Sequence, residues 1–455
     1  MTGTMKRNQI TRPIKNRPNW WVLVRLRPNM HLLTAPVLCG GMLQRMCSGA
    51  LSQRALPHRS TLLAVFLTGA LIACGSDGVS APNGAFHLAS VSAGSRHTCG
   101  VTPAGTAYCW GDNGIGRLGD GTTNFSRTPV AVTGGLTFAT LTAGGLHTCG
   151  LTPAGAAYCW GDNRNGQLGN GISNGPQICA GLFACSQSPV AVLGGLTFIA
   201  LSAGEFHTCG ITFVHVAYCW GYNFDGQLGR PTTGPETCAS GNACSMTPVA
   251  VSGGLTFDII SAATYHTCGV TTTGAAYCWG ANTEGWLGDG SPTASTTPVA
   301  VTGGLKFVSV NAATYHTCGV TTAGAAYCWG DNRSGQLGTG TKVNSLTPAA
   351  VSGGLTFAAL GTGVFHGCGT TRTGAAYCWG DNASGELGNG TTVNSSTPVP
   401  VSGGLTFVAV STGHMGSHTC GVTRGNIAYC WGANGSGQLG DSTNTDRSTP
   451  TFVRH

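Results

Sequence analysis

The sequence predicts an all-β protein, a seven-bladed β-propeller with four-stranded antiparallel blades. The first observation is a repeat of about 50 residues that occurs seven times. The second is that each repeat holds four short runs of β-forming residues, separated by Gly, Asn, Thr and Pro. The third is a pair of cysteines ten residues apart in every repeat. Units of four strands repeated in this way are typical of propeller blades.

The first 74 residues differ in charge from the rest of the chain. They contain ten of the 22 Lys and Arg residues and no Asp or Glu, which leaves 12 basic and 15 acidic residues afterwards. The leader therefore supplies the positive net charge of the whole chain, and the remainder has a net charge of −3. A mildly acidic folded region disfavours nucleic acid as a partner.

Residues 1–45 form an uncertain N-terminal extension. A signal peptide normally begins at the true N-terminus, so this segment indicates a gene-start error, with Met42 or Met46 as the real start. The alternative is a genuine basic extension that acts on membranes, because it contains the run WWVLVRLR.

A signal peptide with a lipobox is expected over residues 46–74. Arg54 and Arg59 precede the apolar run STLLAVFLTGALIAC, which is too short to span a membrane comfortably. Its last four residues resemble a bacterial lipobox, which implies cleavage before Cys74 and lipid attachment to that residue. The alternative is an ordinary signal peptide with an unrelated cysteine. A flexible tether over residues 75–85 favours the lipid anchor, and with it a membrane contact through Cys74.

The propeller is expected over residues 86–455. One unit reads TPVAV, KFVSVNA, YHTCGVT and AAYCWG, and each of these runs has the length and composition of a strand. The first unit begins without a TPVAV run, whereas the chain ends with the surplus run STPTFVRH. We therefore expect the C-terminal strand to complete the first blade and close the ring, which leaves no free sheet edge.

The cysteine pair fits a disulfide across a β-hairpin. A turn centred between them places Cys318 opposite Cys328 and Gly319 opposite Tyr327, with Tyr327 covering the bare glycine. Opposed residues in an antiparallel pair have Cα atoms about 4.5 to 5.5 Å apart, which a disulfide tolerates. The expected disulfides are Cys99–Cys109, Cys149–Cys159, Cys209–Cys219, Cys268–Cys278, Cys318–Cys328, Cys368–Cys378, Cys420–Cys430, Cys179–Cys185 and Cys238–Cys244.

Metal binding is the rival interpretation of the cysteines and of the histidine that precedes each pair. Zinc sites usually contain C-x-x-C spacing, which the sequence lacks, and one cysteine pair per blade would need ligands from elsewhere. One histidine per blade at the same strand position favours a repeated structural hydrogen bond over a ligand set. We therefore expect no metal and no small-molecule cofactor. The histidines are His97, His147, His207, His266, His316, His366 and His418.

The recurring H-T-C-G-V-T followed by G-x-x-Y-C-W-G-x-N-x-x-G-Q-L-G resembles the repeat of the regulator of chromosome condensation family, over roughly residues 86–455. This resemblance implies a seven-bladed propeller. The cysteine pairs and the export signal depart from the eukaryotic pattern, so nucleotide exchange on a nuclear GTPase and chromatin binding are not carried over. Resemblance to secreted bacterial members, among them a β-lactamase inhibitor, implies binding of another protein through loops on one face.

The residue before the histidine varies between repeats and is aromatic in four consecutive ones, Phe206, Tyr265, Tyr315 and Phe365. If these loops share one face, their rings form an arc suited to a protein interface. The alternative is that the rings only cover the ends of the blades.

Two insertions, CAGLFAC and CASGNAC, occur at equivalent positions of neighbouring repeats. The first carries Leu182 and Phe183 between its cysteines, which suits contact with a partner because a rigid loop loses less entropy on binding. The alternative is drift in a loop that tolerates change.

These features together predict a protein-binding or adhesion scaffold of the bacterial cell envelope, lipid-anchored or secreted, with an unknown protein partner. One rival is an envelope hydrolase or lyase that uses a propeller face. No cluster of acidic or nucleophilic residues indicates an enzyme, because the 15 carboxylates are scattered and six of them lie in GDN and GDG turns. The other rival is a purely structural envelope protein.

Overall fold

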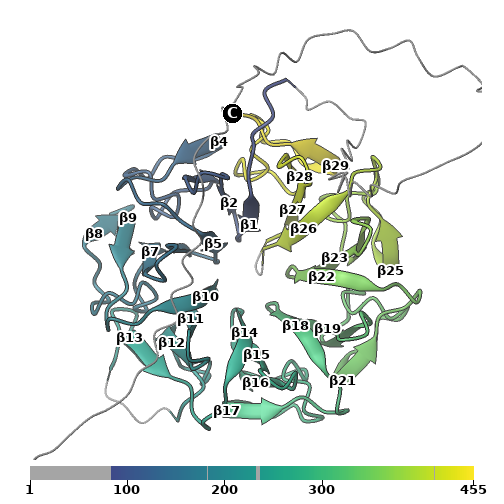
Figure 1. Cartoon of the computed structure of the whole chain (residues 1–455), viewed down its shortest axis with the longest axis horizontal. Helices are drawn as coiled ribbons and strands as arrows, with labels where there is room; N and C mark the ends of the chain where they lie inside the picture. The colour runs from purple at the N-terminus through teal and green to yellow at the C-terminus, as the bar shows by residue number, and fades with distance from the viewer. Residues whose placement is uncertain (1–82, 182, 232–235, 414–415) are drawn as a thin grey trace, which may run out of the picture. The chain divides into compact units, whose positions relative to one another are not determined.

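The computed structural model describes residues 83–181, 183–231, 236–413 and 416–455. These residues form seven antiparallel sheets arranged around a common centre (Figure 1), which confirms the predicted seven-bladed propeller. None of the described residues belongs to a helix that is long and apolar enough to cross a membrane. The predicted extension, signal peptide and Cys74 lie outside the described residues, as do Leu182 and the tether up to residue 82.

Each blade consists of strands that follow one another along the chain, the first strand nearest the centre. The first strands are β1 Ser90–Ala93, β5 Thr140–Ala143, β10 Phe198–Ala203, β14 Phe257–Ala262, β18 Phe307–Ala312, β22 Phe357–Thr362 and β26 Phe407–Thr412. The second strands are β2 His97–Val101, β6 His147–Leu151, β11 His207–Thr212, β15 His266–Thr271, β19 His316–Thr321, β23 His366–Thr371 and β27 His418–Thr423. The third strands are β3 Ala107–Gly111, β7 Ala157–Asp162, β12 Ala217–Tyr222, β16 Ala276–Gly280, β20 Ala326–Gly330, β24 Ala376–Gly380 and β28 Ala428–Gly432. The outer strands are β4 Ser126–Ala131, β9 Phe183–Ala191, β13 Cys244–Ala250, β17 Ser295–Ala300, β21 Ser345–Ala350, β25 Ser395–Pro400 and β29 Arg447–Phe452.

The second blade has five strands instead of the expected four. Its first insertion folds into β8 Gln177–Cys179, which pairs with β9 at the outer edge of the sheet. The corresponding insertion of the third blade forms only an isolated bridge between Thr237 and Ala243.

The hairpin of the second and third strands has the register that the sequence predicts. In the fifth blade Cys318 pairs with Cys328 and Gly319 with Tyr327. The described residues contain nine disulfides, and they are the nine expected pairs. The Cα atoms of Cys318 and Cys328 lie 4.0 Å apart. The side chain nearest to this strand glycine is Phe307 and not the expected Tyr327, because a Cβ on Gly319 would first meet the Phe307 ring at 2.7 Å.

Neighbouring blades pack through a repeated core in which a disulfide of one blade meets two aromatic rings of the next. Between the fourth and fifth blades, the fully buried Cys268 and Cys278 contact Phe307, Val310 and Trp329. Apolar area buried in this way contributes about 25 cal/mol per Å² to stability. The disulfides therefore serve both as covalent crosslinks and as part of the hydrophobic core.

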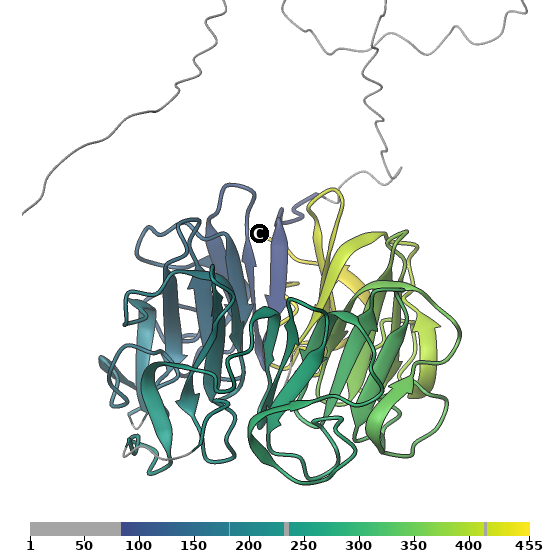
Figure 2. The same cartoon turned by 60° about the horizontal axis from the view of Figure 1, so that its bottom comes forward.

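The ring does not close as the sequence predicted. The C-terminal strand β29 pairs with β28 and completes the last blade, while the first blade is complete with β1 to β4. A repeat of four strands can be divided at any strand, and the correct division places the TPVAV run last in each blade, so the first blade lacks nothing. The N-terminal segment instead joins the two ends, and Figure 2 shows β1 beside the last blade.

The contact that joins the last blade to the first also links the other six pairs of neighbouring blades. The N–H of Phe407 donates to the carbonyl of Gly374 (2.8 Å), and the N–H of Leu88 donates in the same way to Asn426 (2.7 Å). Leu88 is fully buried and packs on Gly100. In the other blades a phenylalanine packs on the equivalent glycine. The last residues add a second link, because Phe86 N–H donates to the carbonyl of Val453 (3.0 Å).

Candidate functional site

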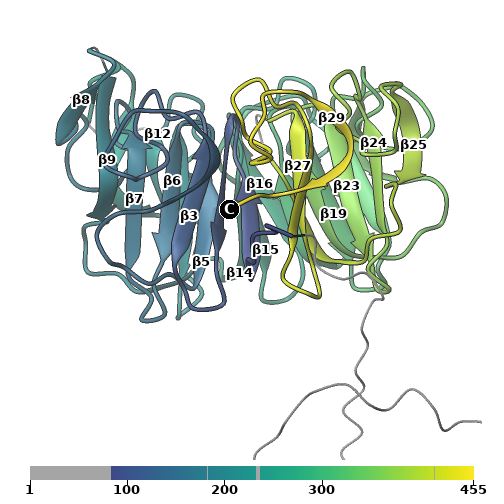
Figure 3. The same cartoon turned by 90° about the horizontal axis from the view of Figure 1, so that it is seen from above.

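The strand order separates two faces of the propeller. In an antiparallel blade, the connection from first to second strand and the connection from third to fourth strand lie at the same end. The hairpin turns and the connections between blades lie at the opposite end, and Figure 3 shows loops at both ends of the strands. We call the first end the loop face and the second the hairpin face.

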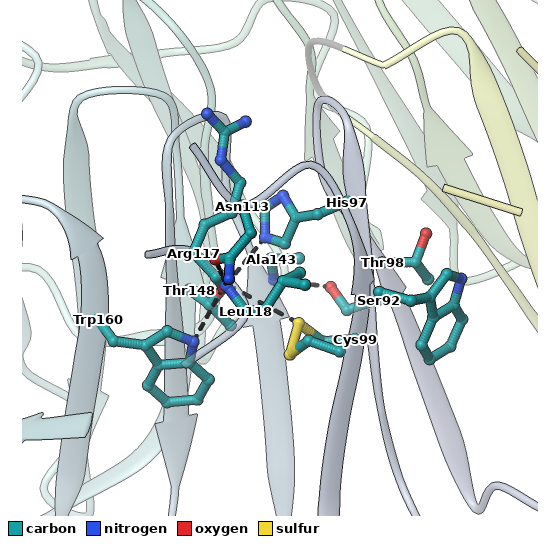
Figure 4. Close-up of a disulfide and its surroundings, with 12 residues drawn as sticks. Ser92, His97, Thr98, Cys99, Asn113, Arg117, Leu118, Ala143, Thr148 and Trp160 are labelled. Carbon is teal, nitrogen blue, oxygen red and sulfur yellow. Dashed lines mark hydrogen bonds between the residues drawn. A yellow bond between two sulfur atoms is a disulfide. The ribbon is translucent and has the colours of Figure 1, made fainter. Parts of the chain in front are cut away.

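The repeated histidines are buried just beneath the loop face and join neighbouring blades. Figure 4 shows the first such junction, where His97 Nε2 lies 2.8 Å from Thr148 Oγ1 of the next blade. The Thr148 hydroxyl donates its only hydrogen to the carbonyl of Arg117 (2.9 Å), and Trp160 Nε1–H donates to the same carbonyl (2.9 Å). The threonine oxygen must therefore accept from His97, which places the imidazole proton on Nε2.

Six of the seven histidines make this bond to the threonine of the following blade, and the sixth blade causes the exception. The other bonds join His147 to Thr208, His207 to Thr267, His266 to Thr317, His366 to Thr419 and His418 to Thr98. His316 has no partner among the described residues because the next blade carries Gly367 in place of threonine.

Burial keeps five of these imidazoles neutral. It lowers the pKa of His147 and His366 to about 3 and that of His316 and His418 to about 4. The pKa of His97 is also well below its usual value, again mainly through burial and then through Arg117. A neutral ring bonded to the neighbouring blade is a structural element. Among the described residues, no three His, Cys, Asp or Glu side chains are grouped as ligands of one metal ion.

The predicted aromatic residues lie on the loop face, and three of them are linked through rings. Tyr265 stacks on Trp286 with ring centroids 6.2 Å apart, and Trp286 lies 5.8 Å from Tyr315. Tyr315 in turn stacks on Phe365 at 5.6 Å with an angle of 21° between the rings. We call Tyr265, Trp286, Tyr315 and Phe365 the aromatic row. Its rings are partly exposed except for Trp286, which is buried between its neighbours.

The fourth predicted aromatic residue belongs to a separate group. Phe206 contacts Tyr222 with ring centroids 5.9 Å apart, and Tyr222 stacks on Phe224 at 6.3 Å. Phe224 is 68 % exposed. The sequence interpretation missed Trp286 and Tyr222, although both interrupt a repeated motif. Trp286 stands where four other units read GQLG, and Tyr222 follows CWG where four other units have Asp.

A pocket of about 440 Å³ separates the two aromatic groups. Residues of the second, third and fourth blades line it, namely Arg164, Asn165, Phe206, Tyr222, Ser240, Asn242 and Tyr265. Ser240 and Asn242 belong to the insertion closed by Cys238–Cys244. The Ser240 N–H donates to the carbonyl of Arg164 (3.0 Å), so this insertion leans on the second blade and completes the pocket wall.

The first insertion supports the pocket without lining it. Phe183 lies under the Arg164 guanidinium, 4.3 Å from ring centroid to Cζ, and packs with Cys179, Cys185 and Leu146. Leu146 occupies in the second blade the position that Phe206 occupies in the third. The insertion therefore covers Leu146, next to the Phe206 end of the predicted arc of rings, and orients Arg164.

Several carboxyl groups with a raised pKa lie in the loops of the loop face. Burial raises the pKa of Glu205 to about 7, against a smaller opposing effect of a hydrogen bond from Thr264. Burial likewise raises the pKa of Glu386 to about 7 and also raises that of Asp225. Arg333 bridges Asp331 (2.9 Å) and Glu284 (3.1 Å) beside the aromatic row.

Comparison with known proteins agrees with this architecture. One profile described as Regulator of chromosome condensation (RCC1) repeat matches seven segments, residues 88–116, 138–167, 198–227, 259–285, 307–336, 357–386 and 407–438. A second profile with the same description matches residues 104–151, 154–211, 273–320, 323–368 and 373–421.

Two solved structures illustrate the shared fold. Human WBSCR16 is 19 % identical with a TM-score of 0.68, and the match covers 77 % of this chain and 95 % of that one. Prp20p of Saccharomyces cerevisiae, whose binding properties to Gsp1p and histones are described with its structure, is 18 % identical with a TM-score of 0.65. The match to Prp20p covers 81 % of this chain and 87 % of that one. The chain belongs to the regulator of chromosome condensation (RCC1) repeat family.

Proposed function

We propose that this protein is an exported, lipid-anchored scaffold of the cell envelope that binds a partner protein through its loop face. The observation that carries the proposal is the aromatic row together with the adjoining pocket. Clustered, partly exposed aromatic side chains are enriched at the energetic centres of protein interfaces, because they bury a large area at a small entropic cost.

The rigidity of the site supports this proposal. The loops that carry Tyr265, Tyr315 and Phe365 each lead into a second strand fixed by a disulfide. The pocket wall formed by Ser240 and Asn242 belongs to a further crosslinked loop. Preorganised loops lose little entropy on binding, so their contacts contribute more of their energy to affinity.

Nine disulfides in the described residues favour an oxidising compartment, and with it export. The N-terminal segment joins the propeller at the hairpin face, where Leu88 bonds to Asn426 in the β27–β28 turn. The fold also supports the proposal by analogy, since the similar yeast RCC1 (Prp20) was crystallised bound to another protein, Kap60.

The test is affinity capture of partners from envelope extracts of the source organism under non-reducing conditions. The variant replaces Phe206, Tyr265, Tyr315 and Phe365 with Ala. A matched control replaces four exposed apolar residues of the hairpin face with Ala, namely Ile199, Phe213, Val308 and Val408. We expect the wild type and the control to capture the same protein and the loop-face variant to lose it. Retention of that protein by the loop-face variant would refute the proposed surface.

Lipid attachment has a separate test. Mass spectrometry of the exported protein should show an acylated Cys74 as its first residue. An N-terminal peptide that begins elsewhere, or an unmodified Cys74, would remove the anchor from the proposal without affecting the binding surface.

A further inference from the structure

The pocket between the two aromatic groups has three rings in its wall. Phe206 and Tyr222 come from the third blade and Tyr265 from the fourth. Phe206 and Tyr222 are inclined at 60° to one another, so they present faces in different directions. The faces of aromatic rings carry negative electrostatic potential, and a cation enclosed by two or three rings is attracted by each of them. The volume of the pocket, about 440 Å³, is within the usual range for ligand sites.

Two carboxyl groups, Glu205 and Asp225, act on the rings of the pocket, although neither belongs to its lining. Tyr265 and Tyr222 both have a raised pKa, mainly through burial, and the charge of Asp225 contributes to both shifts. The Glu205 carboxylate, next in the chain to Phe206, also raises the pKa of Tyr265. Within the part of the chain that the structure describes, neither Glu205 nor Asp225 forms an ion pair.

The one cation in the pocket wall is already neutralised. Arg164 donates to both oxygens of the Asp162 carboxylate, from Nε at 2.9 Å and from Nη2 at 3.0 Å. Its guanidinium also lies over the Phe183 ring. Since the charges of Arg164 and Asp162 cancel, the rings together with Asp225 give the pocket a negative potential, to which Glu205 adds as the pH rises through 7. This negative potential would repel an anionic ligand.

We propose that this pocket binds a cationic side chain, lysine or arginine, presented by the partner protein. The alkyl part of that side chain would lie against Phe206 and Tyr265, and its charged group would lie near Asp225 and Glu205. This inference deepens the proposed function, because it takes the ligand from the partner that the loop face binds. It also predicts that the matching surface of the partner is basic.

The direct test uses the full exported chain with intact disulfides and small probes in place of the partner. Saturation-transfer NMR titrations compare N-acetyl-argininamide and N-acetyl-lysinamide with N-acetyl-norleucinamide, N-acetyl-glutamate and N-acetylglucosamine. We expect weak but saturable binding of the two cationic probes, at least about fivefold tighter than that of norleucinamide. Equal or tighter binding of the neutral, anionic or sugar probe would overturn the inference, and so would the absence of cationic binding.

Variants assign the binding to the pocket. Tyr265→Ala and Asp225→Asn should each weaken the cationic probes about fivefold. Phe213→Ala, which removes an exposed aromatic ring of the hairpin face, is the matched control and should leave probe affinity unchanged. An unaltered affinity in both pocket variants would place the binding elsewhere and contradict the inference. Near-UV circular dichroism and a thiol count establish that each variant keeps the fold and its disulfides.

The two proposals fail in different ways. If the cationic probes bind but the loop-face variant still captures the partner, the proposed function is wrong and the pocket assignment survives. If capture depends on the aromatic residues but the probes do not bind, the pocket assignment alone is wrong. Asp225→Asn separates the two further, because it should weaken capture of the partner while leaving every ring in place.

Discussion

Glu386 is a buried carboxyl whose replacement should stabilise the propeller in a pH-dependent way. It occupies the GELG position, where four other blades carry glutamine, and it is 2 % exposed. The backbone N–H of Ser384 donates to its carboxylate at 2.8 Å, and Ser334 donates to Gln336 of the preceding blade at 2.9 Å in the same way. Glu386→Gln therefore keeps the shape and this hydrogen bond but removes the charge.

The magnitude follows from the raised pKa. Burial, with a smaller effect of Asp381, raises the pKa of Glu386 from 4.5 to about 7. A folded-state pKa above the unfolded value means that the protonated carboxyl stabilises the fold below pH 4.5, and that this stability is lost as the pH rises through 7. The loss is about 3 kcal/mol at pH 8, since one pKa unit corresponds to about 1.4 kcal/mol. Glu386→Gln should recover most of it at pH 8 and almost none at pH 4.5.

The assay is urea unfolding of wild type and variant at pH 4.5, 6 and 8 with the disulfides intact. The reciprocal variant Gln336→Glu places a carboxyl at the equivalent site, where Gln336 Nε2 donates to Asp331 at 3.0 Å. It should lose stability as the pH rises, by a similar or larger amount. If both variants differ from the wild type by the same free energy of unfolding at pH 4.5 and pH 8, the carboxyl at this position does not have a raised pKa.

Three further predictions concern the repeated core. Thr208→Val, which removes the hydroxyl between His147 and the next carbonyl, should lower the free energy of unfolding by about 3 kcal/mol in urea titrations. Replacing both Cys318 and Cys328 with Ser should lower the free energy of unfolding by about 3 kcal/mol, measured in the same way. Free thiols at these two cysteines in the exported wild type would contradict this disulfide. Because burial lowers the histidine pKa values, their contribution is present above pH 6.5 and is lost as the pH falls toward 4, so calorimetry should show a decreasing Tm over that range.

The hairpins could be predicted from the sequence because a strand pair has few degrees of freedom. Once the turn was centred, the ten-residue spacing determined that Cys318 opposes Cys328, and the structure has this pairing. The repeat period determined the number of blades in the same way. Local spacing carries this information because antiparallel pairing depends only on neighbouring residues.

The contacts between blades could not be predicted in this way. A periodic sequence does not show at which strand a blade begins, so β29 was assigned to the wrong blade. The cover of Gly319 by Phe307 and the place of Trp286 between Tyr265 and Tyr315 depend on how strands and neighbouring blades pack. Only Trp286 left a signal in the sequence, as the one unit that reads GWLG.

The repeated residues and the variable residues serve different purposes in this account. Six of the seven blade junctions use the same histidine, threonine and carbonyl, and every junction buries a disulfide, so these residues build the ring. Residues that differ between blades form the aromatic row and the pocket, and both lie on the loop face. Function is therefore expected where the repeat is broken.

Photo-crosslinking from single positions distinguishes the loop face from the hairpin face as the binding surface. A benzoylphenylalanine residue replaces Phe365 on the loop face in one variant and Val308 on the hairpin face in another, and each variant is irradiated in cells of the source organism. We expect one discrete crosslinked protein from position 365 and none from position 308. A discrete protein crosslinked from position 308, with none from position 365, would contradict this expectation.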